Sequence, residues 1–154
     1  MPNFRTLDQA DVRNKRVLLR VDLNVPMENG RVSDATRIER IADTIADIAD
    51  RGGKVILLSH LGRPKGPDPK DSLKPIAAKV AEVIGRPVAF AADCSSEPAA
   101  TAVGAMKPGD VLLLEHYLRQ VRNLRFSLSH VERVSALRDA LKAGKFDILL
   151  LDLN

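Results

Sequence analysis

The fold is decided by a short apolar run, KVILL at residues 54–58, and by the residues on either side of it. The run is continuous rather than alternating, which is typical of a strand buried on both faces of a parallel sheet. Before it, isoleucines recur at helical spacing across residues 38–48, and the pair Gly52-Gly53 ends that pattern. The sequence therefore predicts a helix that leads directly into a buried strand.

The alternation of strand and helix patterns continues in both directions from this run. Further strands are expected at residues 17–21, 88–90, 110–115 and 146–151, and further helices at 73–84, 97–106 and 131–143. Such alternation is typical of right-handed βαβ units, whose parallel sheet is covered by helices on both faces. We expect an α/β fold: a single domain with a Rossmann-like, doubly wound parallel sheet in three α/β/α layers.

Two local signals lie between the first strand and the first helix. The stretch DLNVP at residues 22–26 is rich in turn formers, and Pro26 and Gly30 oppose a continuing strand, so we expect a polar turn. Ser33 is a favourable N-cap residue, and Asp34 would then lie in the first helical turn, where the helix dipole favours a carboxylate.

Composition limits the possible partners of the chain. The chain has 154 residues, about one domain, with a net charge of +4 but only 3% aromatic residues. Basic residues interleaved with stacking aromatics, the pattern of nucleic-acid readers, are not present, so we expect no nucleic-acid partner. No apolar run approaches the roughly 18 residues of a membrane span, and the start lacks a secretory signal, so we expect a cytoplasmic protein without a membrane partner. Cys94 is the sole cysteine, which excludes an internal disulfide and CxxC metal clusters.

Candidate binding residues follow the first two strands. In open α/β sheets ligands bind beyond the carboxyl ends of the strands, and there the chain carries Asp22 and Asn24, then His60 and Arg63. Arg37 lies in the first turn of the first helix, where free N–H groups already favour an anion. Each residue alone also fits an ordinary surface or turn role. Together they suit a small hydroxy acid that bears a phosphate.

Two longer motifs carry a family resemblance. RVDLNVP at residues 20–26 with DATRI at 34–38, and LLSHLGRPKG at 57–66, resemble the signatures of phosphoglycerate kinases. SLKP at 72–75 and GDVLLLE at 109–115 are also similar to that family, and the resemblance covers about residues 4–115.

The resemblance implies a function in glycolysis, the transfer of a phosphoryl group between ATP or ADP and 3-phosphoglycerate or 1,3-bisphosphoglycerate. It implies that Asp22 and Asn24 bind the glycerate part and that His60, Arg63 and Arg37 bind phosphate or carboxylate. Arg37 would also be catalytic, since it would approach the transferred phosphoryl group. This agrees with phosphoryl transfer as a matter of positioning and charge stabilisation.

The family pattern is interrupted after Glu115. The family continues directly with Asn, a variable residue, Arg and Phe, whereas here HYLRQVR at 116–122 precedes NLRF at 123–126. A seven-residue insertion would make Arg125 the substrate-binding arginine, and Arg119 is the alternative. We therefore expect residues 1–154 to form the N-terminal, 3-phosphoglycerate-binding domain, with 116–154 divergent.

The nucleotide is expected to bind elsewhere. In the family a second, C-terminal domain carries Mg-ATP or Mg-ADP, and neither GxxxxGK[ST] nor GxGxxG occurs in this chain. We expect that domain to be absent, no nucleotide or metal to bind this chain tightly, and the chain alone to be a monomeric, inactive fragment of a kinase. The alternative is a non-catalytic α/β module that binds an anion or a protein partner.

The tail permits a second interpretation. Residues 140–154 resemble the helix and strand that lead to the phospho-accepting aspartate of receiver domains, which would be Asp152. An ordinary αβ unit that completes the sheet explains the same pattern and is preferred.

Overall fold

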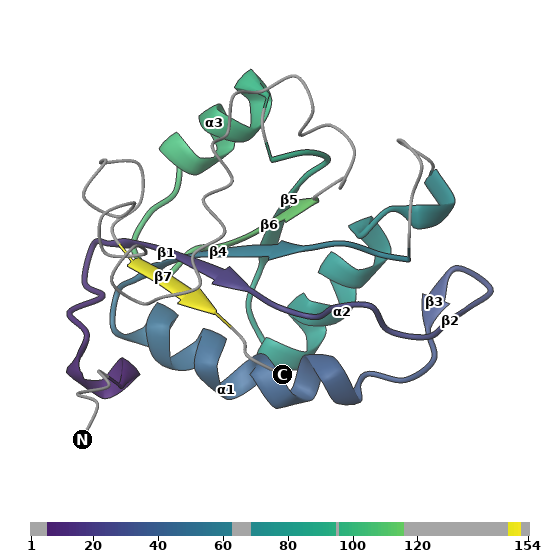
Figure 1. Ribbon diagram of the computed structural model, residues 1–154, viewed down its shortest axis with the longest axis horizontal. Coiled ribbons are helices and arrows are strands. Elements are labelled where there is room, and N and C mark those ends of the chain that lie inside the picture. Colours follow the sequence, from purple (N-terminus) through teal and green to yellow (C-terminus); the bar gives the residue numbers. More distant parts are fainter. Residues whose placement is uncertain (1–5, 63–68, 95, 116–147, 152–154) are drawn as a thin grey trace, which may run out of the picture.

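The computed structural model describes residues 6–62, 69–94, 96–115 and 148–151, and its main feature is a five-stranded sheet (Figure 1). The strand order is β5-β6-β4-β1-β7, and all four pairings are parallel. The strands are β1 (Arg16–Arg20), β4 (Lys54–Ser59), β5 (Val88–Ala91), β6 (Val111–Glu115) and β7 (Ile148–Leu151). The five strands predicted from the sequence are therefore confirmed, and the sheet is parallel as expected.

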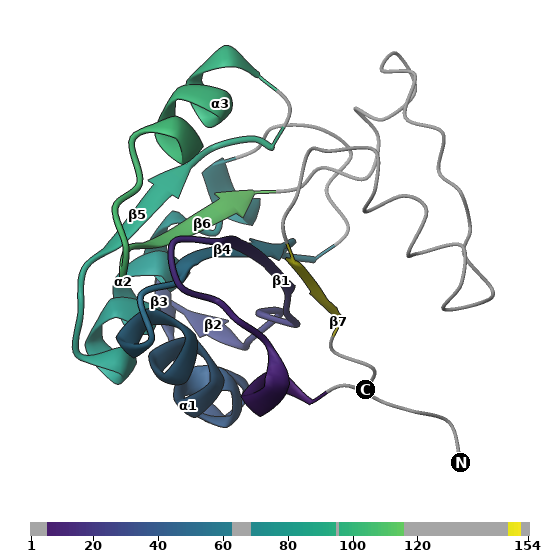
Figure 2. The ribbon, with the colours of Figure 1, turned by 90° about the vertical axis from the view of Figure 1, so that its left-hand side faces the viewer.

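Helices cover both faces of the sheet. Figures 1 and 2 show α1 (Thr36–Asp50) and α2 (Lys74–Ile84) on one face and α3 (Glu97–Gly104) on the other. The described residues also form two short 3-10 helices, η1 (Leu7–Gln9) and η2 (Pro69–Asp71). The doubly wound, three-layer α/β/α prediction is thus confirmed, while the helix predicted at 131–143 lies outside the described residues. Within the described ranges, no helix is long and apolar enough to span a membrane.

The two faces of β4 explain its continuous apolar sequence. Val55 and Leu57 belong to the core shared with α1 and α2, whereas Ile56 belongs to the second core beneath α3. All three side chains are at most 2% exposed. Because fully burying such a side chain contributes about 1.5–3 kcal/mol, the strand is stabilised from both sides.

The first helix ends where the chain has no room for a side chain. Ile38, Ile45 and Ile48 of α1 are fully buried, as their helical spacing predicts. A Cβ at Gly53 would lie 2.6 Å from Ile48 Cγ2 and 2.8 Å from the Ile48 carbonyl oxygen. Gly52 before it has a φ of 80°, which favours glycine. The glycine pair is therefore required by both sterics and backbone conformation.

The predicted start of α1 is wrong by two residues. The N-cap residue is Ala35, not Ser33, and Asp34 precedes the helix instead of lying in its first turn. The Asp34 carboxylate accepts hydrogen bonds from the Thr36 N–H (2.8 Å) and the Thr36 hydroxyl (2.6 Å). Ser33 is held instead by its own N–H, which donates to the Pro26 carbonyl oxygen at 3.0 Å.

A small hairpin occupies the segment where we predicted only a break. Strands β2 (Met27–Glu28) and β3 (Arg31–Val32) pair antiparallel across a two-residue turn. The turn residues Asn29 and Gly30 have φ values of 51° and 75°. Asn-Gly with both φ positive is the sequence signal of a type I′ hairpin, so the hairpin was readable from the sequence.

The segment after β1 is also more ordered than a polar turn. Val21, Leu23 and Val25 are buried in the core. The residues between them, Asp22 and Asn24, are exposed. This period of two continues the strand pattern beyond the end of β1 and presents the two polar side chains on one side.

Candidate functional site

The loops after β1 and β4 meet at the carboxyl edge of the sheet. The two strands are parallel neighbours, so their carboxyl ends lie side by side. The Leu23 N–H donates to Ser59 Oγ at 3.1 Å, and the Gly62 N–H donates to Asn24 Oδ1 at 3.1 Å. Asn24 thus contacts the loop that carries His60, as the prediction of a shared site requires.

Arg37 joins this edge from the first turn of α1. One of its guanidinium nitrogens, Nη1, forms an ion pair and hydrogen bond with Asp22 Oδ2. The side chains of Arg37 and Asp22 remain 50% and 52% exposed, so the pair contributes only about 0–1 kcal/mol to stability. The exposed part of the Arg37 guanidinium can still bind an anion, because this group has five N–H donors.

The remaining predicted residues divide into two groups. His60 is half-buried and follows β4 directly, two residues before Gly62. Gly62 has a φ of 60°, so its backbone adopts the left-handed conformation as it approaches Asn24. Arg63 and Arg125, together with the alternative Arg119, lie outside the described residues.

Arg20 was missed by the sequence analysis. It ends β1 and is exposed, in the same period-two row as Asp22 and Asn24. Side chains two residues apart along an extended segment lie on the same side. Extending the row back by one position would have identified a second cation near the edge.

Charges near the edge are fixed by local contacts. Hydrogen bonds from the hydroxyl and N–H of Thr36 hold the pKa of Asp34 below its ordinary value, so Asp34 is a carboxylate at neutral pH. Burial raises the pKa of the Cys94 thiol, which keeps this side chain protonated.

Among residues 6–62, 69–94 and 96–115, no group of three His, Cys, Asp or Glu side chains could hold a metal ion.

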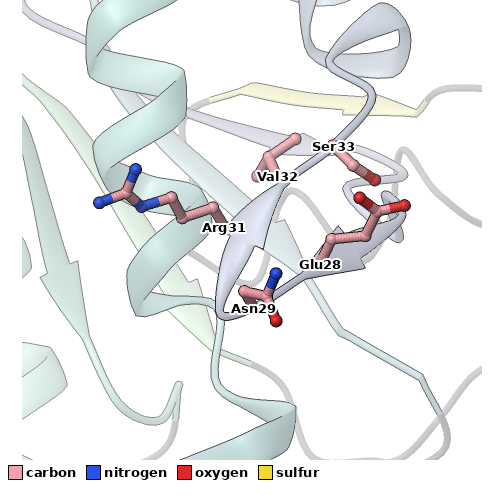
Figure 3. A pocket seen from close by; sticks show the side chains of 5 residues that line it. All are labelled: Glu28, Asn29, Arg31, Val32 and Ser33. Atoms are coloured by element: carbon pink, nitrogen blue, oxygen red, sulfur yellow. The ribbon is translucent and has the colours of Figure 1, made fainter.

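A surface hollow of about 450 Å³ is lined by none of the predicted site residues. It is formed by the β2–β3 hairpin and the residue after it, with Glu28, Asn29, Arg31, Val32 and Ser33 around it (Figure 3). Arg31 extends to one side of the hairpin, whereas Glu28 and Ser33 lie on the other. The carboxyl edge is the stronger candidate, because polar groups from three separate elements converge there.

Comparison with known proteins gives one consistent result. The family model for phosphoglycerate kinase matches residues 7–152. The phosphoglycerate kinase of Bradyrhizobium diazoefficiens is 68% identical over 113 residues, which are 73% of this chain and 28% of that protein. The phosphoglycerate kinase of Mesorhizobium japonicum is 60% identical over 146 residues, or 94% of this chain and 35% of that protein.

Solved structures agree with the sequence matches. The crystal structure of phosphoglycerate kinase from Pyrococcus horikoshii is similar with a TM-score of 0.64 and 29% identity, covering 70% of this chain and 26% of that one. The structure of phosphoglycerate kinase from Coxiella burnetii gives 0.62 and 32%, covering 72% and 27%. This chain spans 28–35% of the length of the two curated relatives described above. The chain belongs to the phosphoglycerate kinase family.

Proposed function

We propose that this chain is the N-terminal, acid-substrate-binding domain of a phosphoglycerate kinase, and that it binds 3-phosphoglycerate or 1,3-bisphosphoglycerate at the carboxyl edge of its sheet. The observation that carries this proposal is the convergence of Asn24, the His60–Gly62 loop and the Asp22–Arg37 pair at that edge. These groups follow β1, follow β4 and begin α1, and the contact between Asn24 and Gly62 joins residues 38 positions apart in sequence.

Each group has a chemical role toward a phosphorylated glycerate. Asp22 and Asn24 offer a carboxylate and an amide for the glycerate hydroxyl. Arg37 presents a partly exposed guanidinium, which can bind phosphate or carboxylate oxygens with two parallel N–H donors. His60, Arg63 and Arg125 would complete the anion site, with Arg119 as the alternative to Arg125. Arg20 adds a further cation on the side of Asp22 and Asn24.

Catalysis by such a site needs positioning and charge stabilisation rather than a covalent intermediate. The acyl phosphate of 1,3-bisphosphoglycerate loses its phosphoryl group to a nucleotide, or the carboxylate of 3-phosphoglycerate accepts one. Arg37 would stabilise negative charge on the transferred group, a role for which an arginine can be worth about 10³–10⁵ in rate. No step is assigned to Mg-nucleotide on this chain, which spans 28–35% of the length of the two curated relatives described above. We infer that residues 1–154 alone do not turn over.

The test is a calorimetric or NMR titration of the chain with 3-phosphoglycerate, for the wild type and for Arg37→Ala. We expect saturable binding that Arg37→Ala weakens at least about tenfold, or about 1.4 kcal/mol. Arg13→Ala is the matched control, because it removes the same charge from an exposed residue before the opposite end of β1. It should leave the affinity within about twofold of wild type.

The controls also separate the possible failures. A folded wild-type chain that does not bind 3-phosphoglycerate would contradict the proposal and favour the non-catalytic binding module. Equal weakening by Arg37→Ala and Arg13→Ala would show that net charge, rather than a formed site, attracts the ligand. Phosphoglycerate-dependent turnover of Mg-ATP by this chain would contradict the inference that it is inactive alone.

A further inference from the structure

Two buried polar side chains stand at the carboxyl edge of an otherwise apolar core. Among the residues that the structure describes, Ser59 (4% exposed) and Glu115 (2% exposed) are the two buried residues that are polar or charged. Ser59 ends β4 and Glu115 ends β6, and the two are Cα partners in the parallel register. Side chains of register partners point to the same face of a sheet.

Each of these side chains holds the backbone of a neighbouring loop. Ser59 Oγ accepts a hydrogen bond from the Leu23 N–H at 3.1 Å, and Leu23 stands between Asp22 and Asn24. Glu115 Oε1 accepts from the Leu73 N–H at 3.0 Å, and its Oε2 accepts from the Ser72 hydroxyl at 3.3 Å.

The Glu115 contact continues toward the candidate site. Leu73 is the N-cap residue of α2, so the carboxylate lies where the helix dipole favours negative charge. A Cβ at Gly62 would lie 3.7 Å from Asp71 Oδ1, which places Asp71 beside Gly62. Gly62 in turn donates its N–H to Asn24. Residues 71–73, which lead from η2 into α2, therefore lie between Glu115 and the loop that contacts Asn24.

Stability alone does not explain polar residues at these two positions. Their strand neighbours on the same face, Leu57 and Leu113, are fully buried apolar residues, and a further apolar side chain would extend that core. Burying a carboxylate is unfavourable unless hydrogen bonds compensate it. Here the compensating donors belong to the loops beyond the strands, so burial of the two side chains is coupled to the positions of those loops.

We propose that Ser59 and Glu115 are positioning residues for the acid-substrate site: Ser59 positions the Asp22–Asn24 segment, and Glu115 positions residues 71–73, which pass beside Gly62 and lead into α2. This inference rests on the proposed function, because it concerns the same site. Neither side chain needs to touch the substrate. Their replacement should change substrate affinity by displacing Asp22, Asn24 and Gly62.

The experiment compares substitutions at the two ends of the same strands. Ser59→Ala and Glu115→Leu remove the acceptors, while Ser59→Thr and Glu115→Gln retain an oxygen acceptor. Val55→Ala in β4 and Val111→Ala in β6 are the controls, because both valines are buried on the same face near the amino ends of these strands. For each variant we would measure urea unfolding, 3-phosphoglycerate affinity, and amide hydrogen exchange at Leu23 and Leu73.

We expect Ser59→Ala and Glu115→Leu to weaken affinity at least about fivefold, with Ser59→Thr and Glu115→Gln within about twofold of wild type. The valine controls should lower stability yet keep affinity within about twofold. Exchange should accelerate at Leu23 in Ser59→Ala and at Leu73 in Glu115→Leu. Equal loss of affinity in the valine controls, or unchanged affinity in folded Ser59→Ala, would overturn the proposal.

Two outcomes need separate treatment. If the wild type does not bind 3-phosphoglycerate, the proposed function fails. Amide exchange alone then decides whether the two side chains position the loops. Unchanged exchange at Leu23 and Leu73 would overturn the positioning proposal. If Glu115→Leu does not fold, the comparison of Ser59→Ala with Ser59→Thr carries the test. A loss of affinity in both Ser59→Ala and Ser59→Thr would also count against the positioning proposal.

Discussion

Different hydrogen bonds hold the loops at the amino edge and at the carboxyl edge of the sheet, that is, at the two ends of its strands. At the amino edge, glycine backbones bind neighbouring loops: the Gly109 N–H donates to the Gly53 carbonyl oxygen and the Asn14 N–H to that of Gly52, both at 2.9 Å. The Arg51 and Arg86 side chains also donate there, but to backbone carbonyl oxygens. At the carboxyl edge, side chains bind the loops, as Asn24 and Ser59 do.

The difference shows how stability and binding can be separated within one small domain. A backbone hydrogen bond is indifferent to side-chain identity, so the amino edge depends on glycines that let the chain come close. The carboxyl edge depends on particular polar side chains, several of them exposed. Substitutions at the amino edge should therefore lower stability without changing affinity, whereas substitutions at the carboxyl edge should also lower affinity.

The largest effect on stability is expected from Gly53→Ala at the amino edge. The new Cβ would overlap Ile48, whose backbone oxygen cannot move without disturbing the end of α1. We expect a loss of about 1–3 kcal/mol in the free energy of unfolding, measured with urea. Gly104→Ala in α3 is the control, because nothing lies within 4 Å of its Cβ, and it should gain about 0.5 kcal/mol. Equal stability of the two variants would refute the steric argument.

A pair of glycines with positive φ tests the comparison directly. Gly62 at the carboxyl edge has a φ of 60°, and Gly109 at the amino edge has a φ of 88°. Alanine at either position should cost about 1–2 kcal/mol of stability, because L side chains disfavour this conformation. Under the proposed function, Gly62→Ala should also weaken 3-phosphoglycerate binding about fivefold, whereas Gly109→Ala should not. Similar affinities for both variants would contradict the claim that only the carboxyl edge contributes to binding.

The smallest effect concerns the carboxylate before α1. The pKa of Asp34 is lower in the folded chain than its ordinary value of about 3.9. Its contribution to stability is therefore full above pH 3.9 and is lost as the pH falls through the lower folded pKa. The stability difference between wild type and Asp34→Ala, measured by urea unfolding, should shrink across that acidic window. A difference that grows toward low pH would contradict this assignment.

Much of the fold could be predicted because its signals are local. The continuous run at 54–58 and the isoleucine spacing of α1 each report burial directly, and both predictions are confirmed. The predicted start of α1 was wrong because Ser33 is a residue type that favours N-caps. In the structure the Ser33 N–H instead donates to the Pro26 carbonyl oxygen across the base of the hairpin. The hairpin was not predicted, because Gly30 was interpreted only as a strand breaker. The pair Asn29-Gly30 is the sequence signal of such a hairpin.

The candidate site could be predicted only in part. The positions of Asp22, Asn24, Arg37 and His60 after strands or at a helix start pointed to one edge, and the structure brings them there. No pattern indicated that Ser59 and Glu115 are buried, because each ends an apolar run as an ordinary loop residue would. Their burial depends on donors that lie 36 and 42 residues away in sequence.

The sequence by itself determined the strands, most helix positions and the family, because periodicity, glycine placement and motifs are properties of neighbouring residues. Only the tertiary structure decided the strand order β5-β6-β4-β1-β7 and which loops meet. Strand order depends on how crossover helices pack on two faces at once, which no local pattern encodes. Asn24 therefore meets Gly62, and Ser59 meets Leu23, because β1 and β4 are parallel neighbours in the folded sheet.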